Sequence, residues 1–189
     1  MKKSMRRVLL FAAILLFLVL LLLIPLFEVP TRITAEKLSK NTGLPFRLLE
    51  RTPDFSGEYG LIGGFGITGY YDRKYEGEAG RNDDNDFDAQ KSGGVIYYVS
   101  KWQDTLTGQN RITNIVVGDP DITLLGCRVG DSTEAFAKAL TEAGFCKTDG
   151  LYCYRKNGVY VSLSPDEETG SVAVFTLFVK PSNLFGIQY

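Results

Sequence analysis

The sequence predicts an α+β protein, with an N-terminal transmembrane helix followed by one extracytoplasmic domain in which an antiparallel sheet packs against one or two helices. Three observations support this prediction. Residues 8–27 contain no charged side chain, residues 133–143 repeat apolar positions with a helical period, and strand-like segments flank the turn dipeptide Asn157-Gly158. Short strands joined by tight turns are typical of an antiparallel sheet with helices on one face. The chain divides accordingly into a basic stub and signal-anchor helix (1–29), a juxtamembrane helix or linker (30–44) and the domain (45–189).

The first element is the apolar run from Val8 to Phe27. As a helix its 20 residues would span about 30 Å, at ~1.5 Å per residue, which matches the hydrocarbon thickness of a bilayer. A cleaved signal peptide is the alternative, but its apolar region usually has ~7–15 residues and ends at a small-x-small site. The first such site here, 33–35, begins with a bulky isoleucine. Because four cations precede the run, the positive-inside rule predicts a single-pass protein of the cell membrane with a cytoplasmic N-terminus and residues 28–189 outside.

The later elements follow from apolar segments separated by Gly, Pro and Asn. Residues 30–42 predict a short helix that ends at Gly43. The expected strands are 46–51, a glycine-kinked hairpin over 58–72, a pair at 94–102 and 111–117, a hairpin at 151–156 and 159–163, and 171–179. The last of these is apolar on both faces, which indicates a central strand.

The helix over residues 133–143 is the clearest element of the domain. Phe136 and Leu140 lie at the spacing of one helical face, and Gly144 is a natural stop. Asp131, followed three residues later by Glu134, resembles a capping box and predicts Asp131 as the N-cap.

The dipeptide Asn157-Gly158 is the strongest hairpin signal in the chain. Pairing Lys156 with Val159 places Tyr154 opposite Val161. One face of this hairpin is then apolar, and we expect it to pack on the helix.

The composition excludes several classes of function. The 189 residues carry 21 Lys or Arg and 22 Asp or Glu. Residues 28–189 hold 17 basic and 22 acidic residues, a net charge of −5, which argues against a nucleic-acid partner because phosphate binding needs clustered cations. The chain has no histidine, so Ser-His-Asp and Cys-His nucleophile systems and His-ligated metal sites are excluded.

A polar segment, 73–94, is longer than most loops in a compact domain. Its candidate metal ligands are Asp83, Asp84, Asp86 and Asp88. An EF-hand needs Gly and Glu at its sixth and twelfth positions, where this chain has Ala89 and Val95. The EF-hand is therefore excluded, and a looser Ca²⁺ site and a solvated acidic loop stay open as alternatives.

Cys146 and Cys153 flank a four-residue turn and are the candidate disulfide partners, because such a close pair can oxidise outside the cytoplasm. Three buried thiols are the alternative. Cys127 is left over, and without a histidine beside it we expect no reactive thiol there.

Catalysis without histidine would need paired carboxylates, a Ser-Lys dyad or a carboxylate-bound metal. Ser100 and Lys101 are neighbours on a predicted strand and point to opposite faces, and Asp119 and Asp121 belong to an ordinary turn. We therefore expect no enzymatic activity, no catalytic residue and no cofactor.

Aromatic side chains are the other candidate for a binding surface. The tyrosine pairs at 70–71 and 97–98, with Trp102, predict either sheet packing or an aromatic binding face.

Motifs in the second half of the chain resemble a family. The runs Ile112-Thr113-Asn114-Ile115, 118–126 and 129–132, followed by Lys156-Asn157-Gly158, are similar to those of uncharacterised bacterial single-pass membrane proteins. The resemblance covers about 95–179. More loosely, Gly-Asp-Ser, a helix and an antiparallel meander resemble BamE-like and beta-lactamase-inhibitor-like modules, which implies protein binding through the sheet and no enzymatic activity. The chain lacks their lipidated cysteine and short length, so a role in outer-membrane assembly is not implied.

These observations predict a membrane-anchored, non-enzymatic domain that binds another protein or an envelope component. One alternative is a cation-dependent binding domain or hydrolase organised by residues 83–88. Another is a structural subunit of a membrane complex that assembles through residues 8–27.

Overall fold

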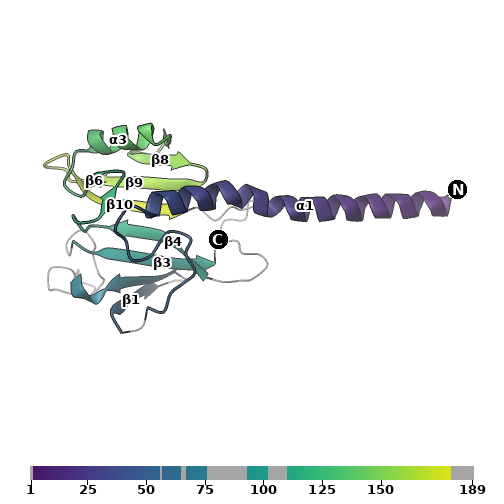
Figure 1. Cartoon of the computed structure of the whole chain (residues 1–189), viewed down its shortest axis with the longest axis horizontal. Helices are drawn as coiled ribbons and strands as arrows, with labels where there is room; N and C mark the ends of the chain where they lie inside the picture. The colour runs from purple at the N-terminus through teal and green to yellow at the C-terminus, as the bar shows by residue number, and fades with distance from the viewer. Residues whose placement is uncertain (1, 56, 65–66, 76–92, 102–109, 180–189) are drawn as a thin grey trace.

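The computed structural model describes residues 2–55, 57–64, 67–75, 93–101 and 110–179 (Figure 1). Among these residues, an eight-stranded sheet has the order β1-β2-β3-β4-β10-β9-β8-β7, and all neighbouring strands are antiparallel. The α+β class with a large antiparallel sheet is therefore confirmed.

The elements are α1 (Lys2–Ser39), β1 (Tyr59–Gly64), β2 (Ile67–Asp72), the 3-10 helix η1 (Arg73–Tyr75), β3 (Val95–Lys101), β4 (Asn110–Val117), β5 (Thr123–Leu124), β6 (Cys127–Arg128), α3 (Thr133–Glu142), β7 (Cys146–Lys147), β8 (Cys153–Lys156), β9 (Val159–Pro165) and β10 (Val172–Val179).

Helix α1 is continuous, so the apolar run and the expected juxtamembrane helix form one element. In Figure 1 its N-terminal part projects away from the sheet, whereas its C-terminal turns lie against the strands. Thr34, Ala35, Leu38 and Ser39 are buried there. The end of α1 is thus part of the domain and not a flexible tether.

The predicted transmembrane segment is only partly described. The side chains of Val8, Phe17 and residues 20–27 lie outside the described ones. Within the part of the chain that the structure describes, no helix is both long enough and apolar enough to cross a membrane.

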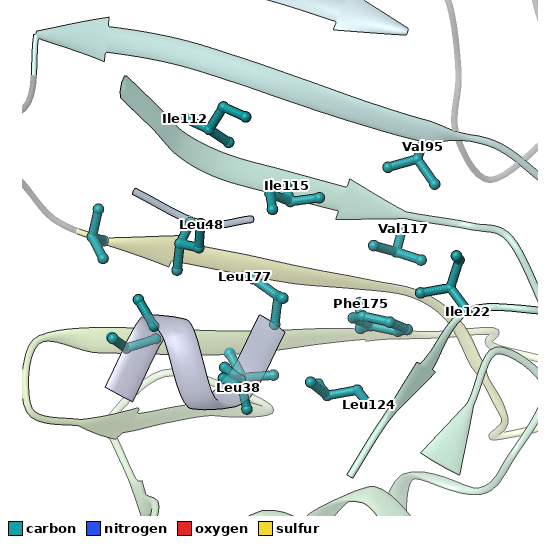
Figure 2. Packing of buried hydrophobic residues seen from close by; sticks show 14 of the residues in the cluster. Leu38, Leu48, Val95, Ile112, Ile115, Val117, Ile122, Leu124, Phe175 and Leu177 are labelled. Carbon is teal, nitrogen blue, oxygen red and sulfur yellow. The ribbon is translucent and has the colours of Figure 1, made fainter. Parts of the chain in front are cut away.

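One face of the sheet carries the hydrophobic core, and the end of α1 and helix α3 both contribute to it. Phe136 of α3 lies with its ring centroid 5.8 Å from that of Phe175 on β10. Figure 2 shows the part of the core around the end of α1, with Leu38, Leu48, Val95, Ile112, Ile115, Val117, Ile122, Leu124, Phe175 and Leu177. Because burying one such side chain is worth about 1.5–3 kcal/mol, the last turns of α1 contribute directly to the stability of the domain.

The predicted register of the hairpin at Asn157-Gly158, which joins β8 and β9, is confirmed. Lys156 pairs with Val159 and Tyr154 with Val161. Asn157 and Gly158 have φ angles of 48° and 79°, which is the combination that a type I′ turn requires. The central position of β10, between β4 and β9, is confirmed as well.

Two local predictions are wrong. The N-cap of α3 is Ser132, whose hydroxyl accepts a hydrogen bond from the N–H of Ala135. Asp131 instead accepts one from the N–H of Arg128, so it closes the preceding turn. Residues 46–50 do not form a strand but a turn that runs beside β4, and only Arg51 makes a strand-like bridge to that strand, opposite Arg111.

Candidate functional site

The acidic residues predicted as metal ligands, Asp83, Asp84, Asp86 and Asp88, lie outside the described residues. Among the residues that are described, no three His, Cys, Asp or Glu side chains are grouped as a metal site would require. The Ca²⁺ alternative therefore stays a prediction.

The candidate disulfide partners, Cys146 and Cys153, are both free thiols in the structure. The β7–β8 ladder pairs Cys146 with Arg155, two positions from Cys153, and a bridge between the two cysteines stays a prediction. Cys146 is exposed, whereas Cys127 is buried. Burial raises the pKa of the Cys127 thiol, and the Asp131 carboxylate raises it further.

Most of the aromatic residues that suggested a binding face are packing residues. Tyr70 and Tyr97 belong to an aromatic cluster on the core side of β2 and β3, together with Phe46, Phe55 and Tyr59. The rings of Phe55 and Tyr70 are stacked with centroids 4.2 Å apart. The aromatic-face hypothesis is therefore wrong for Tyr70 and Tyr97, while Trp102 lies outside the described residues.

Tyr71 and Tyr98 point to the other face and cover glycines on neighbouring strands. A Cβ atom placed on Gly60 would lie 2.2 Å from the ring of Tyr71, and one on Gly69 would lie 2.9 Å from the ring of Tyr98. A ring over a strand glycine replaces the packing that the missing side chain cannot provide. Two of the glycines that suggested a kinked hairpin, Gly60 and Gly69, are thus places where aromatic rings approach the backbone.

Within the described part of the chain, strand β1 forms one edge of the sheet and pairs only with β2. The carbonyl of Glu58 accepts a hydrogen bond from the N–H of Arg73. In an antiparallel ladder, hydrogen-bonded pairs alternate with non-bonded ones. The backbone groups of Leu61 and Gly63 are therefore directed away from β2, toward the open edge.

The described residues of this edge show none of the sequence features that usually protect against strand addition. Natural edge strands carry charges or proline, or are very short, but β1 has the sequence YGLIGG. The side chain of Leu61 at its centre is 70% exposed. At the opposite edge, β7 has only two residues, one of which is Lys147. Of the two sheet edges formed by described residues, the edge at β1 is thus the better suited to accept a further strand.

A second feature is a cleft of about 530 Å³ between the end of α1 and the turn that follows it. Helix α1 contributes Arg32 and Glu36, and the turn contributes Pro45 and residues 47–50. Ser39 joins the two walls, because its hydroxyl donates to the carbonyl of Ala35 and accepts from the N–H of Leu48.

The turn that forms one wall of the cleft is held in an uncommon conformation. Leu49 has a φ angle of 66°, which costs a residue with a side chain about 1–2 kcal/mol. Its N–H donates to the carbonyl of Ile112, and its own carbonyl accepts from the buried guanidinium of Arg111. The N–H of Arg47 donates to the carboxylate of Glu50 at 2.7 Å. These bonds fix the wall against β4.

Sequence reasoning missed both the open edge and the cleft. The absence of charge in residues 59–64 was a readable signal for the edge. For the cleft no local signal exists, since it depends on contacts between α1, the turn and β4.

Comparisons with protein families, with curated proteins and with solved structures found no match to this chain.

Proposed function

We propose that the chain is a membrane-anchored, non-enzymatic domain on the extracytoplasmic side, which binds an extended segment of a protein partner at the edge of its sheet. The observation that carries the proposal is the uncharged edge strand β1 with its exposed Leu61. An extended peptide that adds to a sheet edge gains main-chain hydrogen bonds for affinity, while pockets for alternate side chains supply specificity.

The exposed surface of α1 supports the anchor. Eight apolar side chains in its N-terminal half are 45–71% exposed: Leu9, Leu10, Phe11, Ile14, Leu15, Leu16, Leu18 and Val19. Their positions are distributed around the whole helix, which is typical of a helix surrounded by an apolar medium. Full burial of one such side chain is worth about 1.5–3 kcal/mol, and these are a little more than half exposed, so covering the eight would be worth roughly 7–14 kcal/mol. A bilayer provides that cover without a second protein.

The charges support the orientation. Lys2, Lys3, Arg6 and Arg7 precede the apolar run, and the domain after it carries a net negative charge. By the positive-inside rule the N-terminus remains in the cytoplasm and the sheet lies outside.

Site-specific photo-crosslinking in intact cells tests the binding edge. A benzophenone amino acid is introduced at Leu61 or, as the matched control, at Leu151, which is 83% exposed in the turn between β7 and β8. We expect a discrete crosslinked product with one protein from position 61 and not from position 151. Identical products from both positions, or none from position 61, would contradict the proposal.

A further inference from the structure

The cleft at the end of α1 is lined by charges of both signs. Arg32 and Arg47 contribute two cations, and Glu36 and Glu50 contribute two carboxylates. All four residues are exposed, whereas Leu48 and Leu49 below them are buried in the core. A ligand that carries a single charge would meet repulsion from half of these groups, whereas a zwitterion satisfies both signs. The volume of about 530 Å³ lies within the range of small-ligand sites, ~300–1,000 Å³.

The position of the cleft along α1 indicates the source of the ligand. This step rests on the membrane anchor proposed above. Arg32 follows Phe27, the last residue of the apolar run, by five positions, which is about 7.5 Å along a helix. The polar layer of a bilayer is roughly 5–7.5 Å thick on each side of the hydrocarbon. The backbone of Arg32 therefore lies at the outer boundary of the headgroup layer, and a side chain that leans toward the N-terminus of the helix reaches back into that layer.

The order of the charges along α1 matches one headgroup. Helical side chains lean toward the N-terminus of their helix, which here is the direction of the membrane. The cation of Arg32 therefore lies closer to the hydrocarbon than the carboxylate of Glu36, one helical turn farther out. In a phosphoethanolamine headgroup the phosphate is joined to the glycerol of the lipid and the ammonium is at the free end. The phosphate would therefore lie beside Arg32, and the ammonium would lie beside Glu36, farther from the hydrocarbon.

We propose that this cleft binds the phosphoethanolamine headgroup of a phospholipid from the membrane that holds α1. Arg32 and Arg47 bind the phosphate, and Glu36 and Glu50 accept hydrogen bonds from the ammonium. Phosphatidylcholine has the same phosphate but no ammonium N–H to donate, and phosphatidylglycerol has no cation. The cleft is thus selective for a primary ammonium next to a phosphate. Bound lipid would fix the domain on the membrane surface.

Native mass spectrometry of the full chain released from lipid nanodiscs tests the inference. Three nanodisc compositions are compared: phosphatidylcholine alone, and phosphatidylcholine mixed with either phosphatidylethanolamine or phosphatidylglycerol. We expect one retained phosphatidylethanolamine per chain, favoured over each competitor by about tenfold, since a hydrogen bond to a charged group is worth ~1.5–3 kcal/mol and ~1.4 kcal/mol is tenfold.

Two variants locate the site. Arg47→Gln should reduce this retention by about tenfold, and Arg128→Gln, at an exposed arginine on β6, should leave it unchanged. Because Arg47 is exposed, the change should leave the melting temperature of the chain unaltered.

The outcomes separate this inference from the proposed anchor. A chain that enters the nanodiscs but retains all three lipids equally, or prefers phosphatidylglycerol, overturns the headgroup site and leaves the anchor intact. A chain that does not enter nanodiscs overturns both. If free phosphoethanolamine binds the chain as tightly as the lipid does, the membrane is not the source of the ligand and the inference is wrong.

Discussion

The contact between α1 and the β8–β9 turn can be measured with a double-mutant cycle. The hydroxyl of Thr31 donates to the carbonyl of Asn157 at 2.7 Å. A Cβ atom on Gly158, which has a φ angle of 79°, would lie 3.0 Å from the Thr31 hydroxyl oxygen. Gly158→Ala should therefore cost about 1–2 kcal/mol for the left-handed backbone and at least ~1 kcal/mol for crowding against α1. Thr31→Ala should cost about 1 kcal/mol, the value of one hydrogen bond.

The two substitutions should not be additive. In the double variant the crowding is absent, so the loss of unfolding free energy should fall short of the sum of the single losses by about 1 kcal/mol or more. Thermal unfolding of the full chain in detergent measures this, at about 2–4 °C per kcal/mol for a chain of this size.

Gly170 supplies the control for this cycle. Its φ angle is 68°, and nothing lies within 4 Å of an added Cβ. Gly170→Ala should cost only the backbone strain and should be additive with Thr31→Ala. The reasoning is refuted if Gly158→Ala is no more destabilising than Gly170→Ala, or if its cycle is additive to within ~0.5 kcal/mol.

Three further predictions concern the domain. Ser132→Ala removes the N-cap that binds the N–H of Ala135 and should cost about 1 kcal/mol in urea unfolding, whereas Ser132→Asp should cost almost nothing; equal losses would contradict the assignment of the cap. Leu140→Ala, at a fully buried position of α3, should cost ~2–5 kcal/mol, and a loss below ~1 kcal/mol would place α3 outside the core. Hydrogen bonds from the N–H and hydroxyl of Thr169 and the N–H of Glu168 hold the pKa of Asp166 below its ordinary value of 3.8. Because the folded state favours the carboxylate of Asp166, its hydrogen bonds contribute fully to stability above that ordinary pKa, and this contribution is lost as the pH falls through the lower folded pKa. Carboxyl NMR titration should find the lowered pKa of Asp166. An ordinary pKa would show that the turn is open.

The elements that the sequence predicts correctly are those with a local cause. The turn at Asn157-Gly158 requires two positive φ angles, which few residue pairs adopt, so it determined the register of β8 and β9. The continuous apolar pattern of 171–179 likewise indicated a strand with neighbours on both sides. The capping error has a local cause as well, because Asp131 and Ser132 are both good N-caps and differ by one position.

The cleft and the cysteine geometry depend on contacts that no local pattern records. Leu49 adopts a conformation that leucine disfavours, and only its bonds to β4 hold it there. The spacing of Cys146 and Cys153 suggested proximity, but the β7–β8 ladder offsets them. Such features follow from how distant segments meet, and a short stretch of sequence does not contain that information.

The most direct test of the anchored, extracytoplasmic domain is labelling of intact, reduced cells with a membrane-impermeant maleimide. Cys146 is the exposed thiol of the three cysteines, whereas Cys127 is buried and its pKa is raised by burial and by Asp131, which slows its reaction because the thiolate is the reactive form. We predict that the chain is recovered in the membrane fraction, that it is labelled before lysis as strongly as after it, and that Cys146→Ser removes most of the label. Labelling that occurs only after lysis, or recovery of the chain outside the membrane fraction, would contradict this account.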